Sequence, residues 1–235
     1  MTTFQLKLTA SLLTTLALGA CGGGGGNINP AVNVGPPLVV YANGVSSFDS
    51  LALAAAFAHL PIEALNGAEK DSLIFMREEE KLAYDVCAQL DILWGANNKV
   101  FENIANSEAT HAEAVRQLLL RYGVGDTAAT WTTGLFQNTV LHGLYTQFAA
   151  NGAKSVIDAL KVSAEIEEID IFAIKEALLG IDNQDIVMVY QNLLKGSRNH
   201  LRLFVNNLLL QGVTFVPQHM DAVDYAAIIS TPIER

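Results

Sequence analysis

Basic residues and cysteine are both scarce in this chain of 235 residues. Only 14 residues are Lys or Arg against 24 Asp or Glu, so the formal net charge is -10. Nucleic-acid binding needs clustered cations that neutralise phosphates, and this composition argues against such a partner. With only two cysteines, Cys21 and Cys87, the chain has neither a haem-attachment motif nor a rubredoxin-type cysteine cluster. Any reductant must therefore come from outside the chain.

Phosphate-binding loops and long hydrophobic runs are lacking as well. The glycine run at residues 22–26 lacks the Lys-Ser/Thr pair that a phosphate loop needs, and no nucleophile elbow is recognisable. The apolar segment 48–60 is far shorter than the ~20 residues required to span a bilayer. It is expected to be a short helix packed on the domain and ended by Pro61. At 51% hydrophobic residues, the chain is nevertheless apolar enough to bury a large core.

The N-terminus has the features of an export signal. Lys7 is the only charge before Cys21, and an apolar run extends from Leu8 to Leu18. The sequence Leu18-Gly19-Ala20-Cys21 resembles a bacterial lipobox. That resemblance implies removal of residues 1–20, lipidation of Cys21, and a lipid anchor in a bacterial membrane, on the periplasmic or extracellular side of the cell envelope. An ordinary secretory signal cleaved nearby is the alternative.

The glycine-rich residues after this signal are expected to form a tether, over residues 21–47. Residues 48–235 then form one domain. Within it, four segments have the length and periodicity of bundle helices, at about 66–94, 98–122, 153–180 and 185–211. The first two and the last two are joined by short links, whereas residues 124–152 form a long connection. The pattern predicts an all-α, ferritin-like four-helix bundle with one long crossover between the second and third helices.

Charged residues interrupt the apolar stripes of three of these helices near their centres. An isolated ionised carboxylate in a protein core costs several kcal/mol at least, so converging carboxylates need a compensating cation, and a bound metal is the simplest candidate. A hydrogen-bonded network of buried acids is the alternative. The stripes run Leu73, Met76, Glu80, Ala83, Cys87, Leu90, then Phe101, Ile104, Glu108, His111, Val115, Leu118, and then Ile157, Leu160, Ala164, Glu167, Ile171, Ile174, Leu178.

Glu108 and His111 are three residues apart, so on a helix both project from one face and can reach a common metal pair. A lone Glu-x-x-His is a weak signal. Its place on an apolar stripe strengthens it, as do the stripe carboxylates Glu80 and Glu167 on two other helices.

Each of the four helices carries one short motif rich in polar residues. The motifs are Arg77-Glu78-Glu79-Glu80-Lys81-Leu82-Ala83, Ser107-Glu108-Ala109-Thr110-His111, Ile166-Glu167-Glu168-Ile169-Asp170-Ile171 and Gly196-Ser197-Arg198-Asn199-His200-Leu201-Arg202. Together they resemble those of an uncharacterised ferritin-like family, domain of unknown function 2202, a relative of the rubrerythrins and ferritins. The similarity extends from about residue 60 to 229. It implies a four-helix bundle that binds two iron or manganese ions, with Glu80, Glu108, His111 and Glu167 as ligands.

The fourth helix departs from the symmetric pattern, because Ser197-x-x-His200 replaces Glu-x-x-His. Either one metal is weakly held, or Asp170, one turn after Glu167, supplies the missing oxygen. His200 is a candidate ligand, with a hydrogen-bonded core histidine as the alternative. The remaining acids, Glu78, Glu79, Glu165 and Glu168, lie off the stripes and are assigned to the surface or to positions behind the ligands, with Glu168 the most plausible substitute for Glu167.

Carboxylate and imidazole ligands without thiolate suit two divalent ions of iron, manganese or zinc, and the family resemblance favours iron. The leading hypothesis is therefore a membrane-tethered dinuclear protein that oxidises ferrous ion or reduces peroxide or dioxygen with an external electron donor. A metal-binding or sensing module without turnover is one alternative, and a structural envelope protein is another. Whether copies of the chain form a homo-oligomer is left open.

Overall fold

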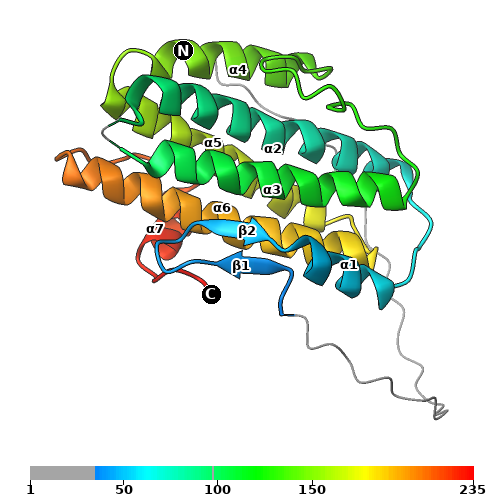
Figure 1. Cartoon of the computed structure of the whole chain (residues 1–235). Helices are drawn as coiled ribbons and strands as arrows, with labels where there is room; N and C mark the ends of the chain where they lie inside the picture. Colours follow the sequence, from blue (N-terminus) through cyan, green and yellow to red (C-terminus); the bar gives the residue numbers. More distant parts are fainter. Residues whose placement is uncertain (1–34, 97) are drawn as a thin grey trace. The chain divides into compact units, whose positions relative to one another are not determined.

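The computed structural model describes residues 35–235 apart from residue 97. The predicted signal peptide, Cys21 and the glycine run lie outside the described residues. Four long helices, α2 (Gly67–Trp94), α3 (Val100–Arg121), α5 (Val156–Leu178) and α6 (Gln184–Leu210), form a bundle (Figure 1). Helix α2 packs chiefly on α3 and α5 chiefly on α6, while contacts of α2 with α5 and of α3 with α6 close the bundle. The predicted all-α bundle is confirmed.

The helices begin and end where local chemistry favours it. At the start of α2, the Asn66 side chain accepts a hydrogen bond from the Glu69 amide at 3.0 Å, and the Glu69 carboxylate accepts one from the Asn66 amide at 2.8 Å. Helices α3 and α6 are followed by Gly123 and Gly212, whose φ angles of +64° and +73° suit glycine. The Glu69 carboxylate also accepts from the amide of Asp182, just before α6, so α2 and α6 begin at the same end of the bundle.

The long connection between α3 and α5 contains one more helix, α4 (Thr139–Gly152), which packs on α2 and α5. The sequence predicted a long connection here but not this helix. Its start is held from α2, because the Glu78 carboxylate accepts hydrogen bonds from the amides of Gln137 and Asn138 at 3.0 and 2.8 Å. At its end, the Trp94 indole donates to the Gly152 carbonyl at 3.0 Å. The crossover is therefore fixed to the bundle at both ends.

A hairpin and two short helices complete the fold. Strands β1 (Leu38–Val40) and β2 (Ser46–Phe48) are antiparallel, α1 (Ser50–Ala58) is the expected short helix, and α7 (Ala222–Ile229) packs on α6. The hairpin corrects the predicted extent of the tether, which included residues 38–47. Its strands are held because Leu38, Ser46 and Phe48 are buried and the Phe48 amide donates to Thr110 of α3 at 3.1 Å.

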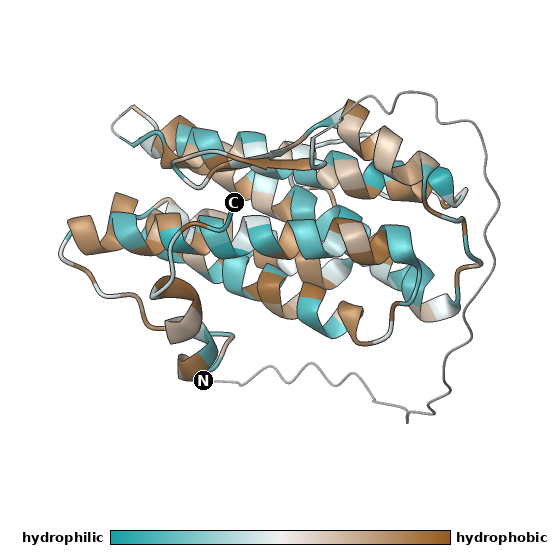
Figure 2. Cartoon of the chain, turned by 90° about the horizontal axis from the view of Figure 1, so that it is seen from below, coloured by the Kyte–Doolittle hydropathy of each residue, from teal (hydrophilic) through white to brown (hydrophobic). Residues whose placement is uncertain are grey.

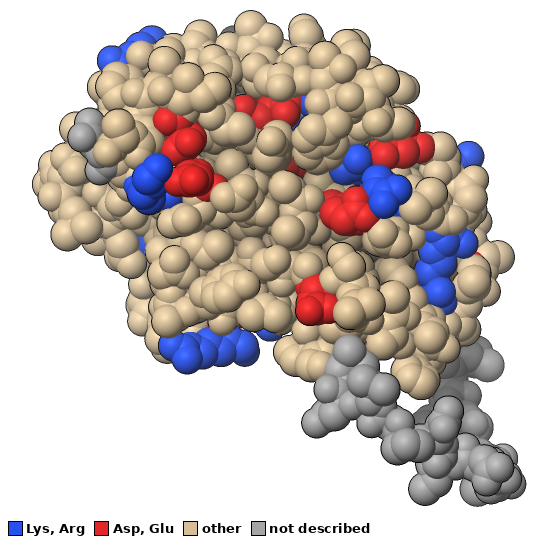
Figure 3. All heavy atoms as spheres, viewed as in Figure 1, with Lys and Arg blue, Asp and Glu red and all other residues tan. Residues whose placement is uncertain are grey.

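Polar and apolar residues are interspersed along the helices (Figure 2). Within the described part of the chain, none of the helices combines the length and apolar character needed to cross a membrane. On the face seen in Figure 3, charged side chains form small separate groups among uncharged residues. Much of the acidic character lies inside instead, in a set of buried carboxylates on α2, α3, α5 and α6.

The packing of α4 predicts that the crossover helix contributes to stability. Phe148 is fully buried against the bundle, so Phe148→Ala is expected to lower the free energy of unfolding by about 3–5 kcal/mol, through lost apolar burial and the cavity left behind. Phe172→Ala, at a side chain 41% exposed on α5, is the matched control and should change it by under about 1 kcal/mol. Urea denaturation followed by circular dichroism measures both. Equal effects of the two substitutions would contradict the packing of α4.

Candidate metal centre

Buried carboxylates fall into two classes according to what neutralises them. Asp85 pairs with Lys81 at 2.5 Å and Asp185 with Arg121 at 2.6 Å. Glu69, Glu78 and Glu168 accept hydrogen bonds from backbone amides. The second class has no cationic Lys or Arg partner among the described residues and gathers around two imidazoles: Glu79, Glu80, Glu108, Glu167 and Asp170, with His111 and His200.

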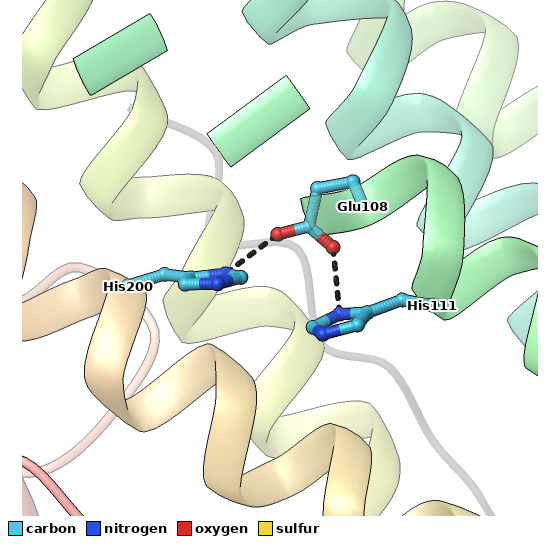
Figure 4. A group of neighbouring side chains, drawn as sticks. All are labelled: Glu108, His111 and His200. Atoms are coloured by element: carbon cyan, nitrogen blue, oxygen red, sulfur yellow. Dashed lines mark ion pairs between the residues drawn. The ribbon is translucent and has the colours of Figure 1, made fainter. Parts of the chain in front are cut away.

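Glu108 stands at the centre of this group, between the two histidines (Figure 4). Its Oε2 lies 3.0 Å from Nδ1 of His111, and its Oε1 lies 2.6 Å from Nδ1 of His200. A further carboxylate approaches each imidazole from another helix. Glu80 Oε2 of α2 is 3.4 Å from Nδ1 of His111, and Glu167 Oε2 of α5 is 3.6 Å from Nδ1 of His200. All four bundle helices thus contribute a side chain to one buried cluster.

Beside the imidazoles lies an all-carboxylate group of Glu79, Glu80 and Asp170. One oxygen from each lies within 4.8 Å of the others. The hydroxyl of Ser197, which stands where a symmetric site would place a glutamate, hydrogen-bonds Asp170. The acid that α6 lacks is therefore present on α5, facing the serine that replaced it. This geometry agrees with the alternative in which Asp170 supplies the missing oxygen.

Two buried groups could each hold a metal ion: Glu108 with His111 and His200, and Glu79 with Glu80 and Asp170. Five of the six residues expected from the sequence belong to one or the other. Glu167 belongs to neither trio, although its 3.6 Å approach to His200 keeps it in the cluster.

Glu79 corrects the sequence interpretation, which assigned it to the surface or behind the ligands. It is 0% exposed and part of the acidic trio. Neighbouring helix positions differ by about 100°, and because α3, α4 and α5 all pack on α2, more than one of its faces is covered. Three consecutive glutamates on α2 were the available signal. Glu78 and Glu168 are buried too, but they accept hydrogen bonds from backbone amides, and Glu165 contacts His219 at 2.9 Å.

Electrostatics within the cluster oppose leaving it without a cation. Burial and the negative charge of neighbouring carboxylates raise the pKa values of Glu79, Glu80 and Glu167 well above the ordinary range. Burial also raises the pKa of Glu108, but the charges of His111 and His200 outweigh it and hold the pKa below its usual value. Burial alone would lower the pKa of His111, but the charges of Glu108 and Glu80 outweigh burial and raise this pKa well above its usual value. Positive charge, as protons or as metal ions, is needed here.

The donor atoms fit a metal ion. Both carboxylate oxygens of Glu79 and Glu80, one oxygen each of Glu108 and Asp170, and Nδ1 of both histidines have no hydrogen-bond partner among the described residues. Buried polar atoms are rarely left without a hydrogen-bond partner, because each has lost the hydrogen bonds that it made to water in the unfolded chain. Carboxylates and imidazoles without thiolate suit iron, manganese or zinc. A cation among these atoms would supply the missing partner.

Comparison with known proteins places this geometry in a family. Residues 69–232 match the family model described as "Uncharacterized protein domain (DUF2202)". The uncharacterized protein MJ0754 of Methanocaldococcus jannaschii is 44% identical over 176 residues, which cover 75% of this chain and 94% of that protein. The crystal structure of hypothetical protein MJ0754 superposes with a TM-score of 0.72 at 43% identity, covering 74% of this chain and 99% of that chain. The match covers nearly all of the four bundle helices and every residue of the buried cluster, and the chain belongs to the DUF2202 family.

Proposed function

We propose that this chain is a ferritin-like dinuclear metal protein that oxidises ferrous ion or reduces peroxide or dioxygen in the cell envelope. The observation that carries the proposal is the position of Glu108, which directs one oxygen to each of two imidazole Nδ1 atoms. A carboxylate with its two oxygens facing separate nitrogen ligands is suited to bridge two ions. Because Glu80 approaches His111 and Glu167 approaches His200, each ion would have a carboxylate of its own.

The proposed division of ligands cuts across the two trios, because each imidazole has an outer carboxylate of its own besides Glu108. Glu80, Glu108 and His111 would hold one ion, and Glu108, Glu167 and His200 the other, with Asp170 and Glu79 as further oxygen donors. Iron is favoured by the family resemblance, and manganese and zinc suit the same donors. A pair of bound iron ions supplies the capacity to exchange electrons with dioxygen or peroxide.

The surrounding residues of the chain exclude bulk water from this site. The candidate ligands are at most 3% exposed, and the helices that carry them also carry fully buried apolar side chains of the two core clusters, such as Leu73, Ile104 and Ile174. In such a medium, the carboxylate charges act on one another with little screening. Reducing equivalents would come from an external donor, because Cys87 is the one cysteine in the described part of the chain and is buried.

Location follows from the sequence in this proposal. The lipobox-like Leu18-Gly19-Ala20-Cys21 supports lipidation of Cys21 and attachment to a bacterial membrane, with the bundle outside the cytoplasm.

A second candidate function is metal binding or sensing without turnover. The observation in its favour is Ser197, which replaces a carboxylate of the symmetric site and leaves Asp170 shared between the acidic trio and the serine. An ion bound there would compete with the Ser197 hydroxyl for Asp170 and would be held more weakly.

Metal content tests the proposal directly. Protein expressed with iron and manganese is expected to carry up to two ions per chain, and Glu108→Ala should lose nearly all of them because it removes an oxygen from both ions. Elemental analysis of purified protein measures this. Glu102→Ala, an exposed position on the same helix, is the control and should retain wild-type stoichiometry. Retention of metal by Glu108→Ala would mean that the bridging residue has been wrongly identified.

Turnover separates the two candidate functions. Reconstituted wild-type protein is expected to accelerate aerobic oxidation of Fe(II), or to consume hydrogen peroxide, well beyond the rate with Glu108→Ala. Absorbance of ferric product and peroxide assays measure these rates. Tight binding of one ion with no reaction would favour the binding or sensing module, and no binding at all would exclude both.

Metal affinity is expected to fall on acidification. Because burial raises the pKa values of Glu79, Glu80 and Glu167, these groups retain protons that an incoming cation must displace. Lowering the pH from 7 to 5 should weaken binding by about tenfold per pH unit for each proton displaced. Competition with a zinc indicator dye at several pH values measures the slope. If the affinity does not change between pH 7 and pH 5, the carboxylates are not ligands.

A further inference from the structure

One side chain outside the bundle helices reaches both candidate histidine ligands. Ser46 of strand β2 is 1% exposed, and its Oγ lies 2.9 Å from Nε2 of His111 and 3.2 Å from Nε2 of His200. The rings of the two histidines are stacked, with centroids 5.3 Å apart and an interplanar angle of 12°. A single hydroxyl can therefore contact the same edge of both imidazoles.

A second hydroxyl joins the same network. Ser107 of α3 donates to the carbonyl oxygen of Ser46 at 2.5 Å and accepts from the Ser46 amide at 3.3 Å. Its oxygen also lies 2.9 Å from Nε2 of His200 and 3.0 Å from Oγ of Ser46. With the proton of each neutral imidazole on Nε2, His111 can donate to Ser46 and His200 to Ser107. Nδ1, the atom facing the carboxylates, then keeps the lone pair that a metal ion needs.

The hairpin is held closely against the site. Besides the Phe48 hydrogen bond to Thr110, the Phe48 ring packs edge-on against His111, with centroids 5.8 Å apart. Gly196 of α6 permits this approach, because a Cβ there would lie 2.6 Å from Cε1 of His111 and 3.0 Å from Oγ of Ser46. In Figure 1, β2 runs alongside α6 and α3. The contact of Ser46 with both rings is thus enforced by packing.

We propose that Ser46 is a positioning residue of the metal centre, which holds both histidines with Nδ1 toward the ions through one shared hydroxyl. This inference rests on the proposed function, and it makes residues 38–48 part of the site. The family match begins at residue 69, so Ser46 lies outside the matched segment, whereas Ser107, His111 and His200 lie within it. A partner of a histidine's second nitrogen fixes ring orientation and raises ligand basicity, and losing it typically lowers metal affinity about 10- to 100-fold.

Cobalt binding to the full chain tests this role. Ser46→Ala is expected to weaken Co(II) binding about 10- to 100-fold and to change the visible absorption of the bound ion, because the imidazoles are no longer held. Ser47→Ala is the matched control: it changes the next residue of the same strand, whose side chain points to the other face, and should leave affinity and spectrum unchanged. Ser46→Thr, which restores the hydroxyl, should recover the wild-type spectrum.

Each outcome bears on one proposal. If the wild-type chain binds no Co(II), the proposed function fails. If wild type and Ser46→Ala bind with affinities within about twofold and with the same spectrum, only the positioning role is overturned, and a lower melting temperature of the metal-free variant would then assign Ser46 to packing. Should Ser46→Ala not fold, Ser107→Ala removes one of the two hydroxyls at His200 and is expected to weaken binding by a smaller factor. Unchanged affinity there would equally contradict the shared hydroxyl network.

Discussion

Burial of negative charge is the constraint on which this structure depends. A carboxylate taken out of water loses its hydration, and the low dielectric of a core strengthens its repulsion from other carboxylates. Helices α2, α3 and α5 bring five carboxylates together inside the bundle, and two imidazoles, even when both are protonated, cannot balance five negative charges. Neutralisation of this cluster, by protons or by metal ions, is therefore a condition for assembling the bundle.

The other buried charges show what neutralisation by the protein looks like. Lys81 lies one turn from Asp85 on α2, and Arg121 at the end of α3 reaches Asp185 at the start of α6. Backbone amides just before α4 donate hydrogen bonds to the Glu78 carboxylate. Each of these carboxylates has an evident structural partner, and none of them is paired with His111 or His200. The contrast with Glu79, Glu80 and Asp170, whose oxygens include several without any partner, identifies which acids are available for an ion.

Much of the fold and of the candidate site was predictable from helical periodicity. A 3.6-residue repeat of apolar residues is a local signal, so it located the four long helices and showed that Glu80, Glu108 and Glu167 face inward. The two short links and the one long connection between these helices predicted the crossover. The same periodicity did not predict that Glu79, one position away from the stripe, is buried. It locates the centre of a buried helix face but does not show how wide that face is. It also carried no information about the hairpin, where a short strand follows a glycine-rich segment.

The sequence by itself determined which helices form and which of their side chains point into the bundle, because both depend on residues within a few turns of each other. Only the tertiary structure decided how those side chains meet. Ser46 is separated from His111 by 65 residues and from His200 by 154, and its contact with both depends on the packing of a hairpin that no periodicity encodes. Likewise, Asp170 faces Ser197 because α5 and α6 pack side by side, which places an acid of one helix opposite the position where the other lacks it.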